Sequence, residues 1–306
     1  MKLFDAHLHF FSYDFFISLA RLVAQRTGEA PEGLLTRAAE KAGFDLPPRD
    51  PIEHLQRWLA AMDRHGVDRA AAFASLPEEA EPLRDACADA DDRLIPLTMV
   101  NPLSQNGAAF ARQALTEMGF RGILLFPSLH HFDLLDDACR PILEIARDCR
   151  AVVLVHCGIL EIKVRDLLGL PRPYNIRYAN PLAVTGAASR YPEVTFIIPH
   201  FGAGLFQETL LAGAQCPNIY VDTSSSNGWM KLRPDSIDLD RVLEMALGTF
   251  GPERILFGTD STTFPRGWRS DVYSAQSAAL ERLGVSIPDR NLIFGENLAR
   301  ILNLRV

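Results

Sequence analysis

Several features that would place the chain in a special class are missing. The 306 residues include only five cysteines and no C-x-x-C pair, which argues against a disulfide framework and a cysteine-based zinc site. No run of about 18 apolar residues could span a bilayer, and the first residues, MKLFDAHLHF, do not resemble a signal peptide. The net charge is −7 and no basic stripe is present, so neither nucleic acid nor an anionic membrane is an expected partner. We expect a cytoplasmic protein that acts on a small molecule.

What the sequence does contain is a series of short apolar runs. Each is rich in Val, Ile, Leu or Phe and almost continuously apolar, which is typical of parallel strands buried on both faces. A G-x-G-x-x-G motif does not follow the first run, and this weakens a dinucleotide-binding interpretation. The predicted strands are Leu3–His9, Arg69–Ser75, Leu94–Val100, Gly122–Pro127, Ala151–Cys157, Thr195–His200, Ile219–Asp222 and Ile255–Gly258.

Amphipathic stretches separate these runs. The predicted helices are Pro51–His65, Glu79–Ala90, Gly107–Met118, Asp136–Arg150, Pro181–Tyr191, Gly204–Gln215, Leu239–Thr249 and Asp271–Leu283. Strands that alternate with helices imply βαβ units and a parallel sheet. Eight such repeats favour a closed (β/α)8 TIM barrel that forms a single domain over residues 1–306.

Two connections are longer than ordinary loops. Phe10–Asp50 follows the first strand and has a mostly helical pattern, so it is a helical insertion that either covers the active site as a lid or contacts another subunit. Glu161–Asn180 follows the fifth strand and is rich in Arg, Tyr and Pro. Long loops after barrel strands lie on the face that carries active sites. The tail Asn291–Leu304 is predicted to be a final helix on the outside of the barrel.

Polar residues lie at the ends of four apolar strands. His7 and His9 are two residues apart, so their side chains leave the first strand on the same face. His156, His200 and Asp260 end or follow the fifth, sixth and eighth strands. Because the carboxyl ends of barrel strands converge on one pocket, we expect these side chains to meet there. Asp5 shares the face of His7, and we expect it to be a buried hydrogen-bonding partner rather than a ligand.

Imidazole and carboxylate groups together are typical ligands of a divalent metal ion. Three histidines and one aspartate suit Zn2+, which is our first expectation, and Mn, Fe, Co or Ni are alternatives. Such an ion lowers the pKa of a bound water from about 15.7 toward about 7. His200 could then act as a general acid or base, and Asp260 could both bind the ion and accept a proton.

The motifs also resemble those of a known family. They are DAHLHF at Asp5–Phe10, VLVHCG at Val153–Gly158, NPLAVTGAASRYPEVTFIIPHFGAG at Asn180–Gly204, ILFGTDS at Ile255–Ser261 and GENLARILNL at Gly295–Leu304. In this order they resemble the amidohydrolase superfamily, and especially the group that includes aminocarboxymuconate-semialdehyde decarboxylase and the resorcylate decarboxylases. The resemblance implies His7, His9, His156 and Asp260 as metal ligands and His200 as the acid or base.

The sequence departs from this pattern in two places. Members with two metals commonly use a carboxylated lysine on the fourth strand, but the fourth strand here is GILLFPS and has no lysine, so we expect one metal ion. The decarboxylases often follow the aspartate of the last strand with Tyr-Pro-Phe, whereas Asp260 is followed by Ser-Thr-Thr-Phe-Pro-Arg. This second difference weakens a direct transfer of decarboxylase activity.

Eight further residues are candidates for substrate contacts. Their positions near strand ends place them on the expected active-site face, and Arg can bind a carboxylate while Tyr or Trp can flank a planar ring. They are Arg266, Trp268 and Arg269 after the eighth strand, Tyr174, Arg177 and Tyr178 in the long loop, and Asn101 and Ser128 after the third and fourth strands.

Three functions fit this site. The first is a mononuclear metal-dependent hydrolase that breaks a C–O or C–N bond in a small, carboxylate-bearing molecule. The second is a non-oxidative decarboxylase of a small aromatic or unsaturated acid, which would use the same ligands. The third is an inactive barrel that serves as a binding protein. We favour the hydrolase because of the altered segment after Asp260. A homodimer is the oligomer that we expect, because dimers are the commonest soluble oligomers.

Overall fold

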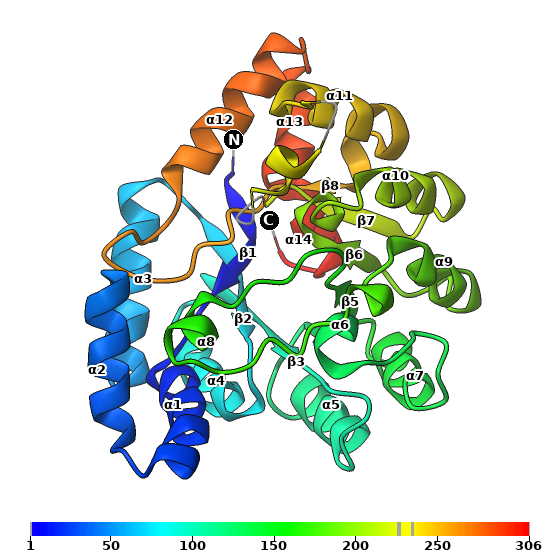
Figure 1. Cartoon of the computed structure of the whole chain (residues 1–306). Helices are drawn as coiled ribbons and strands as arrows, with labels where there is room; N and C mark the ends of the chain where they lie inside the picture. The colour runs from blue at the N-terminus through cyan, green and yellow to red at the C-terminus, as the bar shows by residue number, and fades with distance from the viewer. Residues whose placement is uncertain (1, 225–227, 234–235, 306) are drawn as a thin grey trace.

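The fold is an eight-stranded parallel barrel surrounded by helices (Figure 1). The computed structural model describes residues 2–224, 228–233 and 236–305. The strands are β1 (Phe4–His9), β2 (Arg69–Ala74), β3 (Leu94–Met99), β4 (Gly122–Leu125), β5 (Val152–Val155), β6 (Phe196–Ile198), β7 (Ile219–Asp222) and β8 (Ile255–Leu256). They lie in chain order, each parallel to the next, so the (β/α)8 prediction is confirmed.

The helices are α1 (Tyr13–Thr27), α2 (Pro31–Ala42), α3 (Pro51–Arg64), α4 (Ala80–Ala88), α5 (Gly107–Thr116), α6 (Pro127–His130), α7 (Arg140–Asp148), α8 (Lys163–Leu167), α9 (Pro181–Arg190), α10 (Phe206–Gln215), α11 (Leu239–Phe250), α12 (Ser270–Arg282), α13 (Ile287–Asn291) and α14 (Asn297–Ile301). The eight helices predicted around the strands correspond to α3, α4, α5, α7, α9, α10, α11 and α12, whereas the short helices α6, α8 and α13 were not predicted. None of the helices in the described part of the chain combines the length and the apolar character that a membrane crossing needs.

The barrel closes between β1 and the segment that follows β8. Leu8 forms a parallel bridge with Ser261, and the His9 amide donates to the Ser261 carbonyl at 2.8 Å. The Asp260 amide donates to the His7 carbonyl, also at 2.8 Å. These bonds bring the two ends of the sheet together at the level of the histidines.

Alternation along each strand separates two apolar layers. In β2, Ala71 and Phe73 face the barrel interior, whereas Ala70, Ala72 and Ala74 belong to the layer that packs against the helices. Small side chains on the outer face allow helices to approach the sheet closely. Because both faces are buried, the strands read as unbroken apolar runs, which is why they could be located from the sequence.

The sequence led us to expect the last helix on the outside of the barrel, but this prediction was wrong. Leu298, Ala299, Ile301 and Leu302 belong to the same buried cluster as Phe4 and the other inward-facing strand residues. α14 follows a π-helical stretch, Leu292–Glu296, and closes the interior at the amino ends of the strands. An amphipathic pattern identifies a buried face but not the surface it packs on, which explains the error.

Candidate metal centre and active site

The carboxyl ends of β1, β5, β6 and β8 bring the five predicted polar side chains into one cluster. The imidazole rings of His7 and His9 lie 5.2 Å apart, those of His7 and His200 4.6 Å, and those of His156 and His200 5.4 Å. The carboxylate of Asp260 lies 3.2 Å from Nε2 of His9 and 3.7 Å from Nε2 of His7. The side chains that the sequence predicts to meet therefore do meet.

The backbone at the ends of β6 and β8 is unusual. His200 has φ 56° and ψ 28°, and Asp260 has φ 55°, so both lie in the left-handed region that side chains other than glycine seldom adopt. Such a conformation costs on the order of 1 kcal/mol and persists where the surrounding structure enforces it. Here the left-handed conformation occurs a few residues beyond the end of β6 and of β8, at the residue whose side chain joins the cluster.

Glycine allows the segments after β5 and β6 to touch. Gly158 has φ 73°, and a Cβ atom at this position would lie 2.2 Å from the Gly202 carbonyl oxygen. Any larger residue would therefore push the two segments apart. The close approach keeps the strand ends of His156 and His200 adjacent.

Hydrogen bonds from Nδ1 orient the two histidines of β1. Nδ1 of His7 lies 2.8 Å from a carboxylate oxygen of Asp222, and Nδ1 of His9 lies 2.8 Å from Oγ of Ser75. Each bond leaves Nε2 facing Asp260. This arrangement, with the second nitrogen held by a carboxylate or hydroxyl group, is typical of metal-binding histidines.

The donor set fits a single divalent ion. Two ligand atoms that each lie about 2.0–2.1 Å from a tetrahedral ion are about 3.3 Å apart, and the distances of 3.2 and 3.7 Å between Asp260 and the two Nε2 atoms bracket this value. Nδ1 of His156 is buried and has no hydrogen-bond partner among the described residues. His7, His9 and Asp260 form one compact group of potential ligand atoms, and His7, His200 and Asp222 form another.

Burial and charge set the protonation of the cluster. Burial lowers the pKa of His9 and of His200, and it moves the pKa of His156 well below its ordinary value. Burial alone would raise the pKa of Asp260, but the hydrogen bond to His9 and the nearby charge of His7 outweigh it and lower that pKa. His7 differs, because the charge and hydrogen bond of Asp222 and the charge of Asp260 outweigh its burial and raise its pKa. Binding of an ion would therefore displace a proton from His7, whereas the carboxylate of Asp260 is already ionised.

Three residues that support the cluster were not predicted. Asp222 ends β7 as a polar residue after an apolar run, so the rule that identified Asp260 could have found it. Ser75 follows β2, and its backbone amide donates to the buried Glu79 at 2.7 Å. Glu79 also accepts from the amides of Ser12 and Leu76, so it fixes the loop that carries the partner of His9.

Asp5 has the buried role expected of it. Its side chain is fully buried and accepts hydrogen bonds from the amides of His7 and Thr259 and from the indole of Trp268. Burial raises the pKa of Asp5 to about 6, although these hydrogen bonds lower it in part. Asp5 therefore joins β1, the end of β8 and the loop that follows it.

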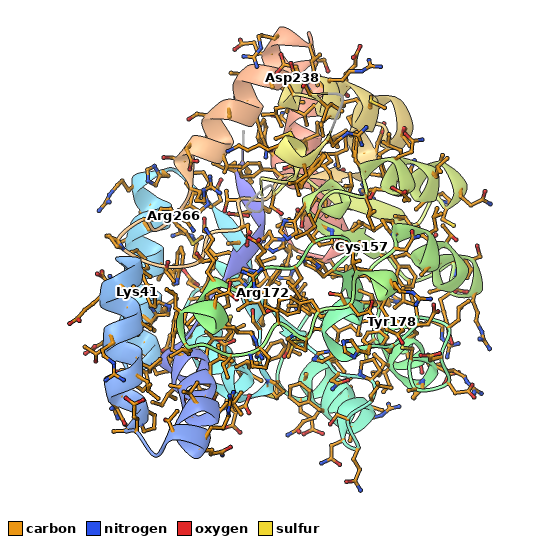
Figure 2. All side chains as sticks on the ribbon, in the orientation of Figure 1. Lys41, Cys157, Arg172, Tyr178, Asp238 and Arg266 are labelled. Atoms are coloured by element: carbon orange, nitrogen blue, oxygen red, sulfur yellow. The ribbon has the colours of Figure 1, made fainter. Side chains whose placement is uncertain are left out.

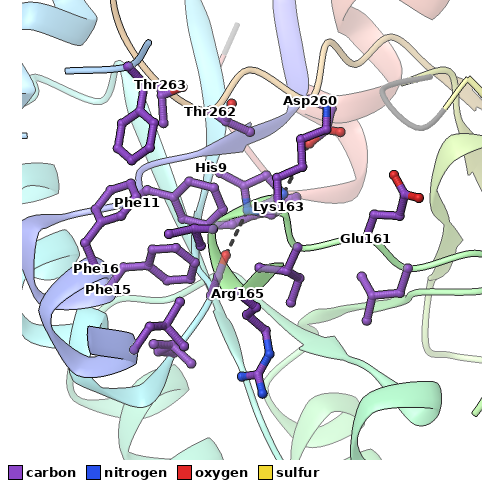
Figure 3. A pocket seen from close by; sticks show the side chains of 18 of the residues that line it. His9, Phe11, Phe15, Phe16, Glu161, Lys163, Arg165, Asp260, Thr262 and Thr263 are labelled. Atoms are coloured by element: carbon purple, nitrogen blue, oxygen red, sulfur yellow. Dashed lines mark hydrogen bonds and ion pairs between the residues drawn. The ribbon is translucent and has the colours of Figure 1, made fainter. Parts of the chain in front are cut away.

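A cavity of about 1030 Å³ opens above the cluster. His7, His9, His156, His200 and Asp260 line its floor. Residues of α1 and of the segment 160–167 form its walls, and Figure 3 shows Phe11, Phe15 and Phe16 on one side and Glu161, Lys163 and Arg165 on the other. The insertion Phe10–Asp50 thus forms part of the cavity wall.

Of the eight candidates for substrate contacts, Arg266 lines this cavity and the other seven are not among its described lining residues. Arg266 donates to Oγ1 of Thr262 at 2.8 Å. Trp268 is buried, with its indole N–H bonded to Asp5, and Arg269 forms an ion pair with Asp271. Both residues follow β8 in the sequence, but position in the sequence did not show that their side chains point away from the cavity.

The remaining candidates lie away from the cluster. Asn101 accepts from the Leu103 amide and so stabilises a turn. Ser128 is buried, and its Oγ has no hydrogen-bond partner among the described residues. Tyr178 stacks on His131, and Arg177 is exposed. Tyr174 is half-buried in the same loop. Figure 2 shows Arg266 and Tyr178 on opposite sides of the molecule.

Comparison with known proteins agrees with this architecture. A family model described as Amidohydrolase matches residues 4–304. A search of curated proteins finds no match to the chain.

Three solved structures illustrate the shared fold. One is 5-carboxyvanillate decarboxylase from Novosphingobium aromaticivorans with bound manganese, at 17% identity and a TM-score of 0.67, covering 99% of this chain and 97% of that one. The enzyme of the same name from Sphingomonas paucimobilis has 13% identity and a TM-score of 0.65, with 99% of both chains covered. A probable 2-pyrone-4,6-dicarboxylic acid hydrolase from Acinetobacter baumannii has 14% identity and a TM-score of 0.63, covering 99% of this chain and 100% of that one.

Proposed function

We propose that this chain, which belongs to the amidohydrolase family, is a mononuclear metal-dependent hydrolase of a C–O or C–N bond in a carboxylate-bearing molecule. The observation that carries the proposal is the meeting of His7, His9, His156 and Asp260 at the carboxyl ends of barrel strands. These four side chains would hold one divalent ion, with Zn2+ as the first expectation and Mn, Fe, Co or Ni as alternatives. When bound, the ion would polarise the scissile carbonyl and acidify an attacking water.

His200 is suited to accept a proton. Its Nδ1 lies 3.1 Å from the backbone carbonyl oxygen of Ser224 and 2.8 Å from the Ser224 hydroxyl oxygen. Because that hydroxyl donates its hydrogen to Asp222, both oxygens accept, and we assign the hydrogen to Nδ1. Nε2 is then left with a lone pair. We assign His200 the role of general base toward the attacking water, and then of acid toward the leaving group.

Asp260 has two roles in this proposal. Its carboxylate lies 3.2 Å from Nε2 of His9, in the position of a ligand, and it borders the cavity. An ionised carboxylate there can also accept a proton from water. Asp222 holds His7 from behind and, through its bond to the His200 amide at 3.2 Å, links the ends of β1, β6 and β7. Asp222 orients these groups, and it is not among the described residues that line the cavity.

Hydrolysis agrees best with these hydrogen bonds. Decarboxylation of an aromatic acid needs a group that delivers a proton to carbon, whereas His200 in this tautomer presents an acceptor. The segment after Asp260 also lacks the Tyr-Pro-Phe sequence common in the related decarboxylases. Arg266, on the cavity wall, would bind the substrate carboxylate.

Decarboxylation is the second candidate, and one observation favours it. The ring of Phe126 stacks on His156 with centroids 5.4 Å apart, and both residues line the cavity. This surface suits a planar aromatic acid whose carboxylate lies toward the cluster.

The expected partners are the substrate and a second copy of the chain in a homodimer. The expected location is the cytoplasm.

The first experiment measures the metal content of the purified, dialysed protein by elemental mass spectrometry. About one divalent ion per chain is expected, together with loss of the ion in His7→Ala/His9→Ala. His65→Ala is the matched control because His65 lies outside the cavity lining, so its metal content should equal that of the wild type. No ion even after reconstitution would favour a binding protein, and two ions per chain would contradict a mononuclear site.

The second experiment identifies the reaction. Esters, lactones, amides and aromatic acids are incubated with the metal-loaded enzyme in 18O-labelled water. Hydrolysis adds one labelled oxygen to the product for each turnover. Release of CO2 without net addition of water would instead establish the decarboxylase.

A further inference from the structure

A row of stacked aromatic rings leads away from the candidate metal centre. Phe11 stacks on His9 with ring centroids 4.7 Å apart and an interplanar angle of 20°, and Phe15 stacks on Phe11 at 4.1 Å and 18°. Phe16 meets Phe15 edge-on at 5.2 Å and stacks on Phe44 at 5.2 Å and 25°. All five rings line the cavity. The row therefore forms one continuous wall that begins at a predicted ligand.

This row is more than core packing. Phe15 and Phe16 belong to the buried cluster that joins α1, α2 and α8, but Phe11 and Phe44 at the two ends are only half-buried. The parts of these two rings that the stacked neighbours leave uncovered border the cavity. Large apolar surfaces that remain accessible inside a cavity usually contact a ligand.

The segment after β5 supplies the facing wall. Ile162, Val164 and Leu167 line the cavity, and Val164 belongs to the same buried cluster as the phenylalanines. Glu161 is exposed and lies on the far side from the aromatic rings in Figure 3. Lys163 and Arg165 also line the cavity. The facing wall therefore alternates apolar side chains with charged ones, and its apolar members can contact the same arm as the rings.

The size of the cavity decides between two kinds of substrate. Ligand sites usually measure about 300–1000 Å³, and the cavity here, at about 1030 Å³, lies at the top of this range. A compact one-ring acid bound at the metal centre would leave the aromatic row in contact with water. A longer molecule would cover the row and gain the free energy of apolar burial.

We propose that the substrate carries an aryl-bearing apolar arm that lies along Phe11, Phe15, Phe16 and Phe44 while its polar head reaches the cluster of His7, His9 and Asp260. The assignment of the head to a metal ion depends on the proposed function. The position of the arm depends only on the aromatic row and the facing residues.

Calorimetric titration of the metal-loaded protein with three hydroxamates tests whether an apolar arm increases the affinity of a ligand. Acetohydroxamate has no arm, benzohydroxamate a short one, and 4-phenylbutyrohydroxamate a long one, while the metal-binding head is the same. Burial of the phenyl ring should make the long compound bind about 10- to 100-fold more tightly than acetohydroxamate. Equal dissociation constants for the three would overturn the proposal.

Two variants locate the arm in the cavity. Phe44→Ala, at the end of the row far from His9, should weaken 4-phenylbutyrohydroxamate about 5- to 10-fold and leave acetohydroxamate within about 2-fold. Ala42→Trp fills the same end from an exposed position on the cavity wall and should weaken the long compound in the same way. Phe110→Ala is the matched control, because Phe110 is also half-buried but lies on α5 outside the cavity lining.

Metal-free protein separates this proposal from the proposed function. If no ion binds, the hydrolase proposal fails, but contacts to the aromatic row do not need the ion. 4-Phenylbutyrohydroxamate should then still bind more tightly than acetohydroxamate, and Phe44→Ala should reduce this difference about 5- to 10-fold. A long compound that gains nothing, or that gains equally in Phe44→Ala and Phe110→Ala, would show that the arm does not lie on the row.

Discussion

The two ends of the barrel are built for different purposes. At the amino end, Phe4, Leu298, Ile301 and Leu302 fill the interior with apolar contacts. The side chain of Asn297 there donates to the Pro252 and Ile255 carbonyls, so its polar group is satisfied. At the carboxyl end, buried imidazoles lie close together, and Nδ1 of His156 has no partner among the described residues. The amino end stabilises the fold through apolar contacts. The carboxyl end instead holds buried polar groups close together, which adds no stability but places them for function.

The largest effect on activity is expected at the carboxyl end of the barrel, when the proposed proton acceptor His200 is removed. His200→Ala should keep the metal, because His200 is assigned to proton transfer, and should reduce kcat by about 10²- to 10⁴-fold. Steady-state kinetics and elemental analysis on the same preparation measure both effects. Loss of the ion in this variant would make His200 a ligand.

At the amino end, the large effect should fall on stability. Leu298→Ala removes a buried side chain that is 3% exposed and should lower the free energy of unfolding by about 2–5 kcal/mol. Urea denaturation measures the change, while metal content and kcat should stay at the wild-type level. Leu211→Ala is the control, since Leu211 is 49% exposed and should cost less than about 0.5 kcal/mol.

His54 connects the carboxyl end to the helix layer and makes stability depend on pH. Burial lowers its pKa from 6.5 to about 4. Because this folded-state pKa lies below the unfolded value, the stabilisation is complete above pH 6.5 and is lost as the pH falls toward 4, by about 1.4 kcal/mol per pH unit.

The measurement compares the wild type with His54→Gln between pH 7 and pH 4. The free energy of unfolding should fall more steeply in the wild type. Parallel curves would mean that His54 has an ordinary pKa in the folded protein.

The smallest expected effect concerns the rim of the cavity. Arg266→Ala should raise KM about 10-fold, corresponding to about 1.4 kcal/mol, through loss of a charged contact to the substrate carboxylate, with the metal content unchanged. Arg269→Ala is the matched control because Arg269 pairs with Asp271. Equal effects of the two variants would place Arg266 outside the substrate site.

The sequence predicted the barrel and the five clustered side chains because both leave local signals. A strand buried on both faces is an unbroken apolar run, and a polar residue at its end is conspicuous. The direction of a side chain in a loop leaves no such signal. Trp268 follows β8 as Arg266 does, yet its indole is bonded to the buried Asp5. The aromatic row was missed for the same reason, since it depends on how α1 packs against α2 and the segment that carries Phe44.

The closure between β1 and the end of β8 also constrains how the protein forms during synthesis. Asp260 follows His7 and His9 by more than 250 residues in the chain, yet its carboxylate lies within 3.7 Å of both imidazoles. Translation adds about 5–20 residues per second, so the histidines wait many seconds for this partner. A growing chain therefore lacks the complete set of proposed ligands until Asp260 has been added, and we expect a metal ion to be captured only after that point.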